Sequence, residues 1–410
     1  MLRNLGLFLI IPSARIMLII KKILRSDFSV LFLLLISILI ISCTESANSV
    51  TTISFNPQMK PRSVSDTGIF KEVRLVQLES DSCIVGRVDK IICNDSLIYI
   101  LDVDIAKEVL IFSKDGKFVN KISRQGHGKY EYTQLWDIFF DREKNELCLL
   151  SRYDQKMISF TPDGKTILEE RCLPKMFSHI LPIEEGYIGY MQNYSQNPSL
   201  PFNIWTMDKF LNLLDGFVRI NPQLESRCTG GVNTMSVYGE VVCFKPEYEN
   251  IIYQIKDGKV SQRYILDFGS KTFPSLSTIS YDNEKEWMKL GYNKISNINN
   301  YVETDKYLLM DFSMNAEHWL GIYNKRKHTA EIASLNNYNG EYSFSFGRIR
   351  GMDQSAVYST VEHEDIYELW RGHNKYVNFE EKFPQQVKNL RKLFPHLKED
   401  GNPFIAIYSL

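Results

Sequence analysis

The sequence lacks an excess of charge of either sign. Its 410 residues include 48 Lys and Arg against 49 Asp and Glu, which gives a formal net charge of -1 and a pI near 6.7. A chain so balanced has no global field that would attract nucleic acid or an anionic membrane surface. We therefore expect no nucleic acid among its partners.

The short motifs of common catalytic and metal sites are also missing. The seven His residues form no His-Glu-x-x-His and no other tight ligand spacing, and no Gly-x-Ser-x-Gly elbow occurs. We therefore assign no catalytic residue, no cofactor and no metal ligand from the sequence. A metal assembled from distant residues at the mouth of a channel stays open.

What is present begins with an export signal. Lys21, Lys22 and Arg25 precede an apolar run over 28–41, which is short for a membrane span and typical of a secretory signal. The run ends in Ile-Ile-Ser-Cys, a bacterial lipobox pattern in which cleavage would leave Cys43 to carry a lipid. The alternative is an uncleaved anchor helix. Because Met17 would open a normal signal, we expect it to be the true start.

Six further cysteines follow Cys43, and none forms a C-x-x-C pair. An exported chain permits disulfides, and the spacing selects no pairing. Cys93, Cys148 and Cys243 stand inside strand-like runs, so buried small hydrophobic residues are the favoured interpretation.

A β-hairpin signal recurs along the chain. The segment 111–123 reads IFSKDGKFVNKIS, two alternating runs around Asp115-Gly116, and Asp163-Gly164 and Asp257-Gly258 stand in similar settings. Each hairpin closes a cycle of about four strand candidates. We predict strands over 87–93, 97–102, 108–113, 117–123, 137–141, 146–152, 156–161, 165–172, 179–183, 187–192, 203–207, 213–220, 307–313, 318–323, 342–349, 356–361 and 403–409, with a fourth cycle over 234–268.

Cycles of roughly 40 to 50 residues with four strands each are typical of β-propellers, in which each blade covers its neighbours. The last cycle is one strand short, and an unpaired strand over 70–78 would complete it and close the ring. The predicted fold is all-β: a six-bladed β-propeller over 69–410 with small helical insertions, after a signal over 1–43 and a flexible tether over 44–68.

Several segments carry a resemblance to a known family: VRLVQLES, LIYILD, VLIFSKDGKFVNKISRQGHGKYEY and EDGNPFIAIYSL. They resemble the six-bladed β-propeller lipoproteins of Bacteroidetes, which are distantly similar to NHL-repeat proteins. The resemblance implies the propeller fold and a lipid-anchored place in the cell envelope. It implies no reaction, and no catalytic residue carries over. Lys129 stands where the family often has Pro after the Gly-x-Gly loop.

Long loops on a rigid scaffold concentrate binding residues. The Asp-Gly hairpins belong to one face of a propeller, so the long connections, over 193–202, 221–233, 270–299 and 362–402, belong to the other. We expect the site there. The candidate binding residues are Arg124, His127, Tyr130, Trp136, Tyr194, Trp287, Arg350 and Trp370.

Two segments invite sharper interpretations that the pattern does not favour. Gly126-His127-Gly128 resembles a phosphate loop, but no third Gly and no helix follow, so we expect a turn between blades. The segment 362–373 offers possible metal ligands, but we expect a solvated polar segment. Those ligands would be Glu362, His363, Glu364, Asp365 and His373.

Helical insertions are predicted over 282–290 and 378–397. In the second, Phe383, Val387, Leu390 and Phe394 share one apolar face. We expect this face to pack on the rim of the propeller, and a groove for a partner is the alternative.

The sequence supports two functional hypotheses. The first is a lipid-anchored, monomeric binding or scaffold module, at the periplasmic face or the cell surface, for a glycan, peptide or partner protein. The second is an NHL-like lyase or hydrolase with its site at the central channel.

Overall fold

In the computed structural model, the described residues are 50–57, 61–228, 234–279, 284–315, 317–335 and 347–410. The predicted signal, its expected start at Met17 and the predicted lipidation site Cys43 lie outside them. The chain divides after Val50, and Thr51–Leu410 forms one unit. No helix among the described residues has the length and apolar character that crossing a bilayer requires.

The alternating apolar runs form six sheets, each built around four antiparallel strands, and two of the sheets gain a fifth, parallel strand. The first three blades are complete in sequence order. Blade 1 is β4 (Lys90–Cys93), β5 (Leu97–Asp102), β6 (Glu108–Ser113) and β7 (Phe118–Ile122). Blade 2 is β8 (Asp137–Asp141), β9 (Glu146–Ser151), β10 (Lys156–Phe160) and β11 (Ile167–Cys172). Blade 3 is β12 (His179–Ile183), β13 (Gly186–Tyr190), β14 (Phe202–Asp208) and β15 (Leu213–Arg219).

The sheets of the other three blades each include a strand from the start of the unit. β1 (Thr51–Ser54) is added to blade 4, β2 (Arg62–Ser63) is added to blade 5, and β3 (Glu72–Gln77) is the fourth strand of blade 6. Blade 4 is β16 (Met235–Tyr238), β17 (Val241–Phe244), β18 (Ile251–Lys256) and β19 (Lys259–Asp267). Blade 5 is β20 (Asn300–Glu303), β21 (Tyr307–Met314), β22 (Glu317–Asn324) and β23 (Thr329–Ser334). Blade 6 is β24 (Ile349–Met352), β25 (Ala356–Val361), β26 (Phe404–Ser409) and β3 (Glu72–Gln77).

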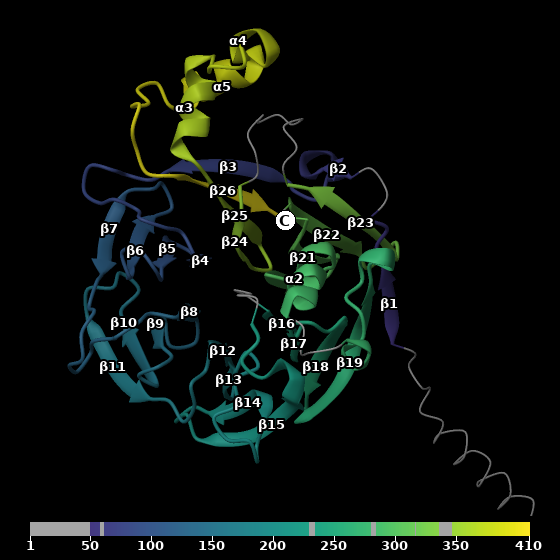
Figure 1. Ribbon diagram of the computed structural model, residues 1–410. Helices are drawn as coiled ribbons and strands as arrows, with labels where there is room; N and C mark the ends of the chain where they lie inside the picture. Colours follow the sequence, from purple (N-terminus) through teal and green to yellow (C-terminus); the bar gives the residue numbers. More distant parts are fainter. Residues whose placement is uncertain (1–49, 58–60, 229–233, 280–283, 316, 336–346) are drawn as a thin grey trace, which may run out of the picture. The chain divides into compact units, whose positions relative to one another are not determined.

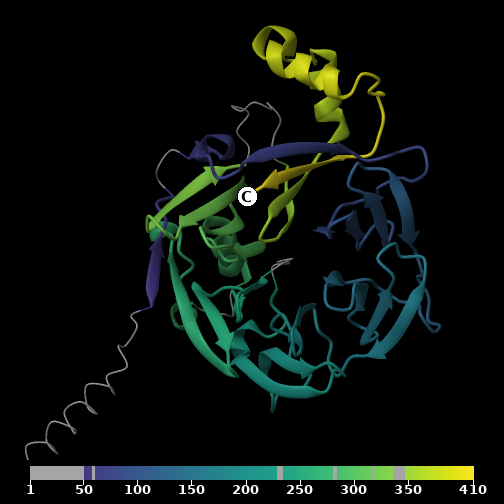
Figure 2. The same cartoon turned by 180° about the vertical axis from the view of Figure 1, so that it is seen from behind.

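The six sheets form a closed ring (Figure 1). The first strands of the blades are innermost, and each contacts the first strands of both neighbouring blades around the full circle: β4, β8, β12, β16, β20 and β24. Seen from behind, the same six sheets surround the centre (Figure 2). The predicted six-bladed, all-β propeller is confirmed.

The ring closes where it was predicted to close. β3 pairs antiparallel with β26, in register from Glu72 opposite Ser409 to Gln77 opposite Phe404. The start of the unit therefore supplies the outermost strand of the last blade, and no blade is left with three strands.

Ordered structure starts earlier than the expected tether over 44–68 allows. β1 (Thr51–Ser54) pairs parallel with β19 of blade 4, and β2 (Arg62–Ser63) pairs parallel with β23 of blade 5. We call residues 51–78 the rim segment. Phe55 is buried and stacks on Phe268 at 5.0 Å. Strands of four and two residues are too short for alternation to show in the sequence, which is why this part read as a tether.

The Asp-Gly hairpins do more than reverse the chain, because they also pack on the preceding blade. The N–H of Glu79, just after β3, donates to the Gly116 carbonyl at 2.8 Å. Asn120 on β7 donates to the Asp163 carbonyl at 3.1 Å, and Arg171 on β11 donates to the Lys209 carbonyl at 3.3 Å. Successive outer hairpins thus bind the outermost strand of the blade before them.

Helices occupy two of the long connections. α2 (Glu284–Asn293) lies between blades 4 and 5, and α3 (His363–Arg371), α4 (Phe379–Lys382) and α5 (Pro384–Leu393) lie between β25 and β26. α3 contradicts the expected solvated polar segment, because its Ile366 and Leu369 are buried. The apolar face of α5 packs on α3, and Phe394 continues the contact to Phe404 at 5.2 Å.

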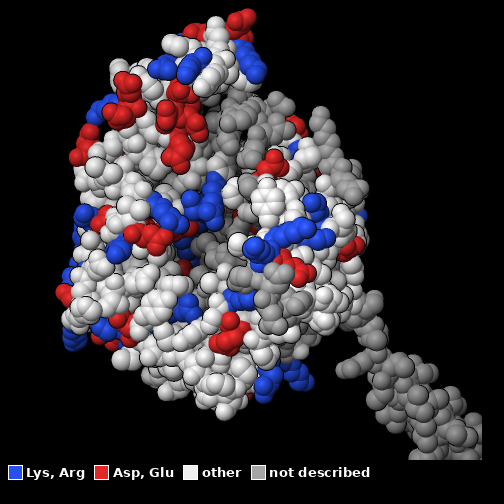
Figure 3. Space-filling model, viewed as in Figure 1, with Lys and Arg blue, Asp and Glu red and all other residues white. Residues whose placement is uncertain are grey.

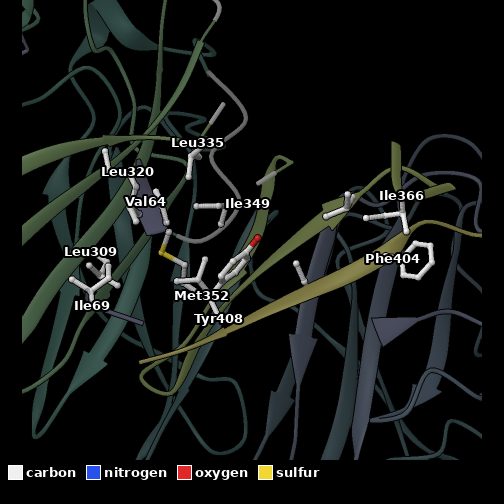
Figure 4. Close-up of a cluster of buried hydrophobic side chains, with 14 of the residues drawn as sticks. Val64, Ile69, Leu309, Leu320, Leu335, Ile349, Met352, Ile366, Phe404 and Tyr408 are labelled. Carbon is white, nitrogen blue, oxygen red and sulfur yellow. The ribbon is translucent and has the colours of Figure 1, made fainter. Parts of the chain in front are cut away.

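One apolar cluster joins these parts. It links the rim segment, blades 5 and 6, and α3, as Figure 4 shows for Val64, Leu320, Ile349, Ile366 and Phe404. Burial of this kind contributes roughly 25 cal/mol for each Å² of apolar surface removed from water. The helical insertion is therefore anchored on the propeller through α3 and through Phe394 at the end of α5.

Strand boundaries agree with the prediction within a few residues except at the start of blade 6. The strand expected over 342–349 meets β24 only at Ile349, and residues 342–346 lie outside the described part. Six cysteines are free thiols; Cys93, Cys148 and Cys243 are buried as expected, whereas Cys172 and Cys228 are exposed.

Candidate functional site

The meander assigns each connection to one of two faces. Connections from second to third strands and from blade to blade leave one end of the sheets, which we call the upper face; the other connections lie on the lower face. All the long connections are on the upper face. Figure 3 looks onto this face and shows Lys and Arg side chains on several sides of a central hollow.

A polar side chain stands at or next to the upper end of every innermost strand. In an innermost strand the rest of the sequence is largely apolar, so each of these residues is the polar head of an apolar run. We call the set the upper ring: Lys90, Asp137, His179, Thr234, Asn300 and Arg350. The sequence analysis found only Arg350.

Three members of the upper ring connect three blades. The Lys90 ammonium donates to Asp137 Oδ1 at 2.6 Å, and Asp137 Oδ2 lies 3.0 Å from His179 Nδ1. Burial acts to raise the pKa of Asp137, but the charges and hydrogen bonds of Lys90 and His179 outweigh it and hold the pKa below its ordinary value. The chain fixes the ring of His179 through Nδ1 and leaves Nε2 for another partner.

The other side of the upper ring holds buried polar atoms that have no hydrogen-bond partner among the described residues. Such groups cost about 1–3 kcal/mol each, and most buried polar groups in folded proteins are paired. Here they gather at one mouth of the channel, on blades 3 to 6. They are Ser178 Oγ, Thr234 Oγ1, both amide atoms of Asn297, Asn300 Oδ1 and Arg350 Nε.

Burial also shifts charged groups at this mouth. Lys245 follows β17, is 3 % exposed and donates to the Pro246 carbonyl at 2.7 Å; burial lowers its pKa to about 8. Asp311 on β21 accepts from Asn300 Nδ2 at 2.6 Å, yet burial raises its pKa to about 6. Both shifts favour neutral forms, as expected where charge is withdrawn from water.

Two predicted residues meet around an arginine that the sequence analysis missed. The Arg152 guanidinium lies 4.7 Å from the ring centre of Trp136 and 5.3 Å from that of Tyr194. Arg152 is 7 % exposed, and its Nε donates to the Met176 carbonyl at 3.2 Å. The cluster joins the upper loops of blades 2 and 3 with stacked cation and aromatic groups.

Arg124, His127 and Tyr130 share the connection between blades 1 and 2. The predicted turn is present, and its amides are taken internally: Glu131 Oε2 accepts the Gly128 N–H at 2.8 Å. A Cβ on Gly126 would lie 2.1 Å from the same oxygen. The Glu131 carboxylate thus occupies the position that a bound phosphate would take, which argues against an anion loop.

Trp287 and Trp370 belong to the helical insertions. Trp287, a residue of α2, is buried against Tyr248 and Phe273. Trp370 on α3 donates its indole N–H to the Phe394 carbonyl at 2.9 Å. Both side chains hold insertions together, and neither joins the upper ring.

The possible ligands over 362–373 do not converge. Both ring nitrogens of His363 face backbone carbonyls, Nδ1 that of Asn402 at 3.3 Å and Nε2 that of Lys398 at 3.0 Å. Across all residues with described positions, no three His, Cys, Asp or Glu side chains group as metal ligands.

A cavity of about 470 Å³ lies away from the upper ring, at the rim between blades 1 and 6. Its lining includes Arg74, Glu79, Gly116, Phe394 and Lys398. Lys398 pairs with Asp81 at 2.8 Å, and Phe118 N–H donates to Glu79 at 3.0 Å. Its polar groups largely satisfy one another across the ring closure, so we interpret it as a crevice of that seam.

Fold and upper ring together define a six-bladed β-propeller with a polar, partly unsatisfied channel mouth. The chain belongs to the family described as a domain of unknown function, DUF4934, whose model matches residues 50–409. No protein among the curated ones matches the sequence.

Solved structures share the fold. A "putative exported protein" from Bacteroides fragilis is 20% identical, with a TM-score of 0.69 over 87% of this chain and 99% of that one. A member of the DUF4221 family from Bacteroides vulgatus is 9% identical, with a TM-score of 0.47 over 83% and 97%. A streptogramin B lyase is 11% identical, with a TM-score of 0.39 over 70% and 94%. The last two scores are below 0.5, so neither likeness bears on function.

Proposed function

We propose that this protein is a non-catalytic binding or scaffold module of the cell envelope, whose upper mouth receives a glycan, a peptide or a loop of a partner protein. One observation carries the proposal: buried donors and acceptors from four blades gather without partners at one end of the channel. A ligand with hydroxyl or amide groups would supply those partners and recover the free energy that their isolation costs.

The same module would be exported and held by a lipid on Cys43. The lipobox-like sequence before Cys43 supports this anchor. The name of the Bacteroides fragilis relative as an exported protein agrees with export. Strand β1 begins at Thr51, so seven residues, 44–50, would separate the lipid-bearing Cys43 from the propeller.

A second candidate function is a lyase or hydrolase at the same mouth. The Asp137–His179 contact favours it, because a buried carboxylate on Nδ1 leaves Nε2 free to take a proton from a bound substrate or water. The alternative is that the contacts among Lys90, Asp137 and His179 only stabilise the packing of three blades.

Glycan and peptide arrays probed with residues 44–410 test the binding function. We expect a defined set of ligands, and we expect Thr234→Val and Ser178→Ala to weaken their binding about 10-fold by removing one polar atom each. Tyr238→Phe, at the lower end of β16, is the control. Equal binding by all four proteins would place the site elsewhere. A ligand released in cleaved form, with cleavage lost in His179→Asn, would support the enzyme.

Lipid attachment is tested by metabolic labelling with palmitate in a bacterial host. We expect the wild-type chain to carry label and the Cys43→Ala chain to carry none, because the thiol is the only atom that the lipobox chemistry would modify. Globomycin, which blocks signal peptidase II, should leave the uncleaved precursor. Equal labelling of both chains would refute the anchor.

A further inference from the structure

Arg350 interrupts the innermost strand of blade 6. In the ladder between β24 and β25, Ile349 lies opposite Ser359 and Gly351 lies opposite the adjacent Tyr358, so Arg350 is an extra residue without a partner. A β-bulge of this kind takes a side chain out of the regular alternation and often stands beside a functional site. Here it sets the orientation of an arginine at the upper ring.

The charge at this bulge forms no close ion pair with a described carboxylate, although the charges of Asp89 and Glu362 act on it. Arg350 Nε is buried without a hydrogen-bond partner, and neither Arg348 nor Arg350 forms an ion pair within the described part of the chain. Burial, and after it the charge of Arg348, lowers the pKa of Arg350 to about 10. The nearby carboxylate of Asp89 is already engaged by Arg87 at 2.7 Å.

The positive field extends to the neighbouring blade. His318 on β22 lies within its reach, and burial together with the charges of Arg348 and Arg350 lowers the pKa of His318. A partly buried guanidinium beside a second cation is unfavourable unless an anion compensates it. The charges of Asp89 and Glu362 offset that of Arg350 only in part, and Asp311 lies within the reach of Arg348. Because no described carboxylate pairs closely with either arginine, an anion from outside would complete the compensation.

We propose that Arg348 and Arg350 bind the anionic group of an acidic saccharide at the upper mouth, an inference that rests on the binding function proposed above. The planar fork of a guanidinium matches a carboxylate or a sulfate through two parallel hydrogen bonds. The arginines would therefore take the acidic group, whichever of the two the sugar carries.

The sugar is favoured over other anions by the groups that surround the arginines. β20 contacts β24, which brings Asn300 with its unpartnered Oδ1 beside the bulge. Farther around the mouth, the unpartnered atoms of Thr234 and Ser178 are hydroxyls, which both donate and accept. A ring of sugar hydroxyls complements such groups, and a bare inorganic anion does not.

Titration calorimetry on residues 44–410 tests the inference. The probes are a galacturonic acid trisaccharide, its uncharged methyl ester, a sulfated disaccharide and sodium sulfate. We expect an acidic saccharide to bind at least 10-fold more tightly than the ester. Arg350→Gln and Arg348→Gln should weaken the acidic saccharide about 10- to 100-fold, the loss of charge-assisted hydrogen bonds, and leave the ester within about 2-fold. Arg142→Gln, an exposed arginine of the lower face, is the matched control.

Thermal unfolding of the same variants separates recognition from a structural role. We expect Arg350→Gln to raise the melting temperature by about 1–3 °C, because it removes a partly buried cation that lies near Arg348 and has no close ion-pair partner among the described residues. A lower melting temperature, with binding of acid and ester lost together, would make Arg350 structural and overturn the proposal.

Three further outcomes also overturn it. Equal affinity for the acid and the ester would refute the recognition of an anionic group by the two arginines, while the proposed binding function would stand. Sulfate ion binding as tightly as the saccharides would mean an adventitious ion only. Peptide binding on the arrays with no acidic glycan bound would refute the saccharide.

Discussion

Gly116→Ala is expected to destabilise the propeller by about 3 kcal/mol or more, and Gly258→Ala by only about 1 kcal/mol. Both glycines end an Asp-Gly hairpin with positive φ, +82° at Gly116 and +65° at Gly258. A Cβ at Gly116 would lie 1.9 Å from the Gln77 carbonyl oxygen, whereas one at Gly258 meets nothing within 4 Å. Only Gly116 therefore combines backbone strain with a clash.

That clash falls on the strand that closes the ring. Gln77 is the last residue of β3, so relief would require blade 1 to move away from the seam with blade 6. Denaturant unfolding followed by tryptophan fluorescence measures both variants, with the midpoint compared at constant slope. If the two alanine variants lose the same stability, the hairpin is only a turn and not a contact that holds the ring closed.

Glu303→Gln is expected to cost about 3–5 kcal/mol, since it leaves two partly buried cations without their counterion. Glu303, at the lower end of β20, is 0 % exposed. Arg263 Nη2 donates to it at 2.7 Å and Lys325 Nζ at 2.8 Å. Arg263 belongs to blade 4 and Lys325 to blade 5, so the carboxylate joins two blades where the channel ends.

The matched control is Glu331→Gln, which removes an exposed pair with Arg62 at 3.5 Å and should cost under about 1 kcal/mol. The pH dependence adds a second check. Burial acts to raise the pKa of Glu303, but the hydrogen bonds and charges of Arg263 and Lys325 hold it below 4.5. The stabilisation that Glu303 contributes is full above pH 4.5, its ordinary pKa, and is lost as the pH falls through the lower pKa of the folded state. The free energies of unfolding of the wild type and of Glu303→Gln should therefore converge in acid. If the wild type and Glu303→Gln were equally stable at pH 7, Glu303 would not be a stabilising contact between blades 4 and 5.

Much of the fold is local enough to be predicted. β5, β6, β8, β12 and β25 have the predicted bounds, because each is a run with clear turn residues on both sides. Blade closure followed from counting strands, since the last cycle needed one from outside itself. The strands β1 and β2 could not be predicted, because their pairing depends on an edge that exists only once blades 4 and 5 have formed.

The helix α3 was missed for a different reason. Its first turn holds Glu364 and Asp365, which suit the positive end of a helix dipole but made the segment look like a polar loop. The apolar pair Ile366 and Leu369, three residues apart, was the available signal.

The candidate site was predicted as a face and not as a set of residues. The long connections share the upper face, as predicted, and Arg350 lies on the upper ring. The sequence shows a polar residue at the start of several apolar strands, namely Lys90, Asp137, His179 and Asn300. That pattern gains meaning only when six strands start side by side around one channel, which no single segment encodes.

A crystal structure of residues 44–410 with an acidic saccharide tests the central claim most directly. The account predicts electron density for the sugar at the upper ends of the innermost strands, with its acidic group at Arg348 and Arg350 and hydroxyls at Asn300 or Thr234. Density at the rim cavity beside Gly116, or on the outer faces of the blades, with the upper mouth holding no sugar, would contradict it.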